Sequence, residues 1–141
     1  MKSYFTIILI AVIFLINLGN SVYAQVSEAD AKTVLNSIFD ASSKEDYNKA
    51  ASLLMFEKVL DKRAYNNSDP AEQKSVKRIC KKIKAYIDLS DSYEVSGSKS
   101  VNMQGLNGTV LDVVFKSGDQ KLNIAFTFLN VSGKILLSDF K

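Results

Sequence analysis

The spacing of the apolar residues changes once along this chain, and that change limits the fold more than any other feature of the sequence. Before Asp91 the apolar residues recur every three or four positions, which is typical of one face of a helix. After Asp91 they alternate with polar residues, as in strands that bury one face. Helices followed by strands predict an α+β domain in which the helices pack on one face of an antiparallel sheet.

Two amphipathic segments begin with similar capping patterns. Ser27 and Asp30 resemble a capping box, in which side-chain oxygens accept from free amide groups at a helix start. This predicts a helix over residues 28–41. Ser43 and Asp46 repeat the pattern and predict a second, shorter helix.

The next segment is ambiguous, and a third helix follows it. Residues 53–65 suit either a continued helix or a bent connection. Asp69 can cap a helix, and Pro70 is tolerated at the first helical position, so a helix is expected to begin there. Its apolar stripe contains Cys80, which we interpret as a small buried residue.

The second half predicts at least four antiparallel strands joined by short turns. The residues of each turn favour a tight reversal, and they are Asn107-Gly108, Ser117-Gly118-Asp119 and Ser132-Gly133. Gly97 is expected to mark a bulge in the first strand.

The alternation also predicts which side of each strand is buried. In the second strand the buried set is Thr109, Leu111, Val113 and Phe115. The third strand has the most apolar face, so it is expected to be central, and that face consists of Leu122, Ile124, Phe126 and Phe128. In the last strand strict alternation places Ile135 and Leu137 on one side and Leu136 and Phe140 on the other.

Residues 1–24 have the pattern of a cleaved export signal. Lys2 precedes an apolar run of about fifteen residues, shorter than the roughly twenty needed to cross a bilayer, so a retained anchor is the weaker alternative. We expect cleavage near Ala24–Gln25 and export to the periplasm or the exterior. No cysteine follows the run, so the lipid-attachment signal of lipoproteins is missing. Residues 25–141 are then expected to form a single domain.

Composition narrows the function classes. The sequence has no histidine, which removes the commonest general base and metal ligand, and we predict no catalytic residue, metal site or cofactor. Residues 25–141 carry 17 Lys and Arg against 15 Asp and Glu, too near neutrality to favour a nucleic-acid partner.

The order of elements resembles the nuclear transport factor 2-like superfamily. The resemblance rests on the turn at residues 39–47, FDASSKEDY, and the closing strand at residues 131–140, VSGKILLSDF. Both are similar to those of small exported bacterial domains of unknown function. The resemblance implies three helices on a curved antiparallel sheet that forms a cone-like cavity, and often a homodimer through the sheet. Enzymes of the superfamily usually place histidine, aspartate, tyrosine or arginine in the cavity. Because this sequence has no histidine, the resemblance assigns no catalytic residue to it.

Four residues are candidates for lining such a cavity: Asp40, Tyr47, Tyr86 and Tyr93. Tyrosine offers an apolar ring with a polar tip, which suits a small apolar ligand. Core packing is the simpler role for each tyrosine, and the turn after the first helix is the simpler role for Asp40.

The third helix has a dense group of cations. They are Lys74, Lys77, Arg78, Lys81, Lys82 and Lys84. These residues flank the apolar stripe, so an ordinary solvated face explains them. An anionic surface, such as a membrane, is the alternative partner.

These observations favour an exported, non-catalytic domain that binds a small apolar ligand or a protein. Two alternatives stay open: a small cavity enzyme of the isomerase or hydrolase type that uses carboxylate and tyrosine groups, and an adaptor that binds anionic surfaces through the basic third helix.

Overall fold

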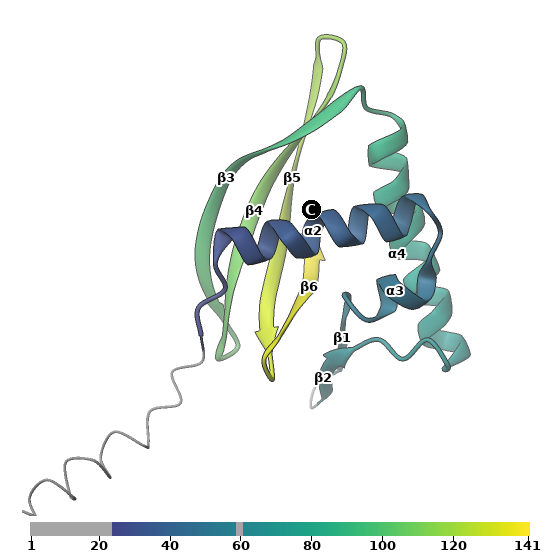
Figure 1. Cartoon of the computed structure of the whole chain (residues 1–141), viewed down its shortest axis with the longest axis vertical. Helices are drawn as coiled ribbons and strands as arrows, with labels where there is room; N and C mark the ends of the chain where they lie inside the picture. The colour runs from purple at the N-terminus through teal and green to yellow at the C-terminus, as the bar shows by residue number, and fades with distance from the viewer. Residues whose placement is uncertain (1–23, 59–60) are drawn as a thin grey trace, which may run out of the picture.

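The computed structural model describes residues 24–58 and 61–141, so the predicted export signal lies outside the described residues except for Ala24. Helices precede a four-stranded antiparallel sheet, which confirms the α+β class (Figure 1). In chain order the elements are α2 (Glu28–Ser43), α3 (Tyr47–Ala51), β1 (Met55–Lys58), β2 (Asp61–Ala64), α4 (Pro70–Asp88), β3 (Ser92–Met103), β4 (Leu106–Ser117), β5 (Gln120–Val131) and β6 (Lys134–Phe140).

The large sheet has the strand order β3-β4-β5-β6, so β5 is an inner strand, as its apolar face predicts. Figure 1 shows the sheet curving around α2, which crosses the concave face, while α4 stands at the far end of α2. No helix in the described part of the chain is long and apolar enough to span a membrane.

Two of the three expected helix starts are confirmed. The Ser27 hydroxyl oxygen accepts from the amide of Asp30 at 3.1 Å, and the Asp69 carboxylate accepts from the first amides of α4. The second start is wrong by a few residues, because Ser43 still belongs to α2. Asp46 caps α3 itself by accepting from the amide of Lys49 at 3.0 Å.

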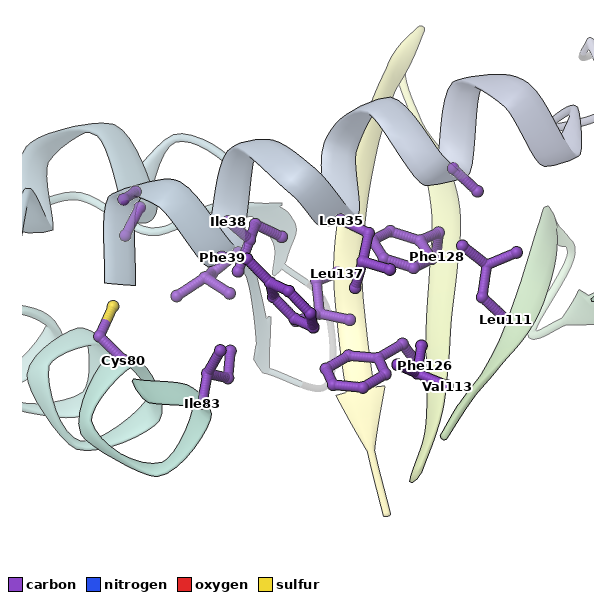
Figure 2. Close-up of a cluster of buried hydrophobic side chains, with 14 of the residues drawn as sticks. Leu35, Ile38, Phe39, Cys80, Ile83, Leu111, Val113, Phe126, Phe128 and Leu137 are labelled. Carbon is purple, nitrogen blue, oxygen red and sulfur yellow. The ribbon is translucent and has the colours of Figure 1, made fainter. Parts of the chain in front are cut away.

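The main core lies between the concave face of the sheet and the helices (Figure 2). Phe126 and Phe128 of β5 are fully buried there, and Phe39 of α2 packs edge-on against Phe126 with ring centres 5.5 Å apart. Cys80 of α4 is 1% exposed in this core, as expected for a small buried residue. Aromatic rings therefore fill the inside of the cone.

Residues 53–65 form neither a continued helix nor a simple bend. They contain the antiparallel hairpin β1–β2, which begins beside β6, where the amide of Leu137 donates to the carbonyl of Leu53 at 2.9 Å. Met55 joins a second buried cluster with Leu129, Val131 and Leu136. Tertiary pairing with β6 thus decides the conformation of this segment.

The predicted reversal at Asn107-Gly108 is wrong. The turn between β3 and β4 uses Gln104 and Gly105, whose φ angles are 53° and 77°, and Asn107 and Gly108 lie inside β4. Gly108 is required for another reason. A Cβ atom there would lie 2.5 Å from Cδ2 of Leu129 and would overlap the Phe128 carbonyl oxygen.

Two bulges modify the register of the sheet. The expected bulge in β3 is present between Val95 and Gly97. A second irregularity lies between β5 and β6, where Phe128 faces Leu137 but Phe126 faces Phe140. Phe140 and Leu137 consequently share the concave side, which corrects the strict alternation expected for the last strand.

Candidate functional site

A pocket lies at one end of the concave face, where the end of α4 meets the β4–β5 hairpin, near the top of Figure 1. Its volume is 320 Å³. We call it the mouth pocket, and its lining residues are Tyr86, Leu89, Ser90, Phe115, Ser117, Gln120, Lys121 and Leu122.

The apolar lining residues of the mouth pocket include two leucines that are partly exposed. Leu89, at the end of α4, is 75% exposed, and Leu122, on β5, is 46% exposed. Large apolar side chains that gather at a surface depression are typical of interaction sites. Tyr86 and Phe115, with ring centres 5.6 Å apart, form the inner wall.

The mouth pocket ends at this aromatic wall. Phe115 is 2% exposed and its ring contacts those of Phe39 and Phe126, at 5.9 and 6.5 Å between centres. The filled core behind Phe115 therefore limits a ligand to the open end of the cone.

A hydrogen-bonded connection holds the rim in place. The Asp91 carboxylate accepts from the amide of Gly118 at 2.8 Å, and the Asp91 amide donates to the carbonyl of Lys116 at 2.8 Å. The Ser90 hydroxyl donates to the carbonyl of Tyr86 at 2.6 Å. The two Asp91 bonds connect the segment after α4 to the β4–β5 hairpin, and the Ser90 bond closes the last turn of α4, so both sides of the mouth pocket are held by hydrogen bonds.

Two of the four cavity candidates lie at this end. Tyr86 lines the mouth pocket, and Tyr93, 41% exposed, packs against Phe115 with ring centres 5.9 Å apart. They converge on the same aromatic wall because β3 begins directly after α4.

The other two candidates lie elsewhere, at the α2–α3 turn. Asp40 forms ion pairs with Lys44 at 2.7 Å and Lys49 at 3.2 Å, and the hydrogen bond from Lys44 lowers its pKa. Partial burial is the main cause of the raised pKa of Tyr47, whose ring lies under the ammonium group of Lys77 at 5.5 Å. Neither residue lines the mouth pocket.

The mouth pocket is lined by apolar side chains together with uncharged polar and ionisable ones. Its ionisable lining residues are Tyr86 and Lys121, and no carboxylate is among the lining residues. Residues 24–58 and 61–141 contain no cluster of His, Cys, Asp or Glu that could hold a metal ion. The enzyme alternative calls for carboxylate and tyrosine groups that converge in the cavity, and this lining contributes Tyr86 but no carboxylate.

The cations of the third helix lie on α4 as expected. Lys84 pairs with Asp88 at 3.1 Å, and the ammonium group of Lys82 lies 4.9 Å from the centre of the Phe140 ring. The remaining four surround a shallow surface groove of 460 Å³, and they are Lys74, Lys77, Arg78 and Lys81.

Comparison with known proteins adds a likeness of fold. The chain is similar to a designed nuclear transport factor 2-like protein, a substituted form of Rd1NTF2_05. The identity is 13% and the TM-score is 0.47, over 82% of this chain and 98% of the other. No known protein family and no curated protein matches the sequence.

Sequence reasoning missed the two leucines that border the mouth pocket. Leu122 was expected to be buried with the rest of its strand face, but β5 extends beyond the cover of the helices. The exposure of Leu89 could have been predicted from the sequence. Leu89 follows Ala85 by four residues and so lies on the polar side of α4 rather than on its apolar stripe.

Proposed function

We propose that this protein is an exported, non-catalytic binding domain whose mouth pocket takes a small apolar ligand. The observation that carries the proposal is the apolar border of this pocket, where Leu89 and Leu122 are exposed beside the aromatic wall. Leaving such side chains in water forgoes about 1.5–3 kcal/mol for each that could be fully buried. A ligand that covers them recovers part of this free energy.

The dimensions and rim of the mouth pocket favour one class of ligand. Its 320 Å³ lies at the lower end of the range for small-molecule sites, which suits a short alkyl chain or one ring system. Ser117 and Gln120 at the rim supply hydrogen-bonding groups. The ligand we propose is therefore a small apolar molecule with one polar end.

Binding is tested with the fluorescent probe 8-anilinonaphthalene-1-sulfonate, which has an apolar ring system and a polar group. We expect saturable binding to the native protein and a dissociation constant raised roughly tenfold by Leu122→Asn, which removes a partly buried contact. The matched control is Met103→Asn. Met103 is also a large exposed apolar residue, 43% exposed, but lies on the β3–β4 hairpin outside the mouth pocket.

Equal loss of probe binding in the two variants would contradict the proposal, because the probe would then report general surface hydrophobicity. Native mass spectrometry of the protein purified from its source tests whether it retains a ligand and whether its N-terminal segment has been removed. A retained ligand supports the binding role, and a mass equal to that of residues 25–141 supports export with cleavage.

A further inference from the structure

The outward side of α4 combines a row of cations with an exposed leucine. Residues spaced by three or four lie along one side of a helix. Lys74, Arg78 and Lys81 follow this spacing, and Ala85 and Leu89 continue it to the end of the helix. We call this row the basic stripe; Lys77 lies next to it.

The charges of the basic stripe are not balanced within the described part of the protein. The ion pairs formed by α4 use Glu72 near its start and Asp88 near its end. Lys74, Arg78 and Lys81 have no ion-pair partner among residues 24–58 and 61–141 and are exposed. Like charges at these spacings repel, so an anionic surface brought against the stripe would relieve this repulsion.

The chemistry of the stripe distinguishes a membrane from a protein partner. Protein interfaces obtain most of their affinity from a few desolvated anchors, often aromatic, at the centre of the contact. The basic stripe has no aromatic residue at its centre. Cations with an aliphatic side chain at one end suit the surface of an anionic bilayer, where the cations meet phosphates and the leucine enters the interface.

We propose that α4 docks on an anionic phospholipid bilayer through Lys74, Arg78, Lys81 and Leu89. Leu89 belongs to both surfaces, because it also lines the mouth pocket. Docking in this orientation places the pocket beside the lipid, from which a small apolar ligand could enter. The docking itself rests on the charge and exposure of α4, not on the ligand proposal.

The test is co-sedimentation of the protein with vesicles of phosphatidylcholine alone or mixed with phosphatidylglycerol. Binding is expected only with phosphatidylglycerol, and it should largely disappear at about 0.5 M salt because the charges are screened. The double variant Arg78→Gln/Lys81→Gln should lower the partition coefficient roughly thirtyfold. The control Lys99→Gln/Lys134→Gln changes net charge equally on other exposed surfaces and should lower it less than about threefold.

A second pair of variants tests the orientation. Leu89→Asn should lower partitioning by roughly tenfold, whereas Met103→Asn, at the other end of the sheet, should leave it nearly unchanged. Circular dichroism of each variant verifies folding, which these exposed side chains do not control.

Three results would overturn the proposal: no vesicle binding by the native protein at low salt, equal losses in the two double variants, or capture of an acidic protein without vesicle binding. The Leu122→Asn probe measurement is independent of these results. Failure of membrane docking and failure of ligand binding can therefore be told apart.

Discussion

Replacing Gly108 by alanine tests why a glycine occupies this position. Gly108 lies inside β4 and faces Leu129 of β5. An added Cβ would lie 2.5 Å from Cδ2 of Leu129, whose side chain can rotate, and well within 3.0 Å of the Phe128 carbonyl oxygen. That oxygen cannot rotate away, because its strand is fixed by β4 on one side and β6 on the other.

The expected cost follows from the displacement that alanine requires. The two strands must separate locally by more than half an ångström to restore an ordinary contact. Overpacking of this kind costs about 1–3 kcal/mol, and weakening a neighbouring strand hydrogen bond adds about 1 kcal/mol. We therefore expect Gly108→Ala to lower the free energy of unfolding by about 2–4 kcal/mol, a large share of the 5–15 kcal/mol typical of a domain.

Urea denaturation followed by circular dichroism measures this loss of unfolding free energy. Alanine variants of two other glycines serve as controls. Gly97→Ala should be neutral or slightly stabilising, because its Cβ would meet Asp112 at an ordinary 3.5 Å. Gly105→Ala should cost about 1 kcal/mol, because its φ of 77° is unfavourable for alanine although the space is open. If Gly108→Ala is as stable as Gly97→Ala, the close approach to β5 does not constrain this residue.

Two further predictions concern acid stability and thiol reactivity. Hydrogen bonds from Arg63 and the Asn66 amide lower the pKa of Glu72 from 4.5 to about 2. Its stabilising effect is therefore complete above pH 4.5 and lost as the pH falls towards 2, and the difference in urea midpoint between the native protein and Glu72→Gln should shrink over that interval. A difference that stays constant down to pH 2 would contradict the assignment. Burial raises the pKa of Cys80, so a thiol reagent should modify the native protein at least about 10³-fold more slowly than the urea-unfolded chain; comparable rates would show that Cys80 is accessible.

Local rules predicted the elements that local interactions determine. The caps at Ser27 and Asp69 and the three- and four-residue spacing define α2 and α4, because a helix satisfies its hydrogen bonds within its own segment. Two-residue alternation likewise predicted the inner position of β5, since an apolar strand face requires cover.

The errors occurred where contacts distant in sequence outweigh local preference. Asn107-Gly108 has a strong turn preference, yet the register of β4 with β5 places it inside a strand. The β1–β2 hairpin depends on pairing of Leu53 with Leu137 and on the hydrogen bonds between Arg63 and Glu72. None of these contacts can be read from the spacing of apolar residues.

The candidate site was predictable only in part for a related reason. The sequence identified Tyr86 and Tyr93 as aromatic residues suited to a cavity, and both lie at its open end. It could not show that α2 stops short of covering Leu122, since cover depends on how far the helices extend over the sheet.

The two proposed surfaces are linked by one helix. The inner side of α4 contributes Cys80 and Ile83 to the core, so the helix cannot move independently of the sheet without exposing buried residues. Its outer side carries the basic stripe, and its last turn provides Leu89 to the mouth pocket. A contact made by the stripe therefore fixes the position of the pocket directly, and no conformational change is needed to bring the apolar border to a lipid surface.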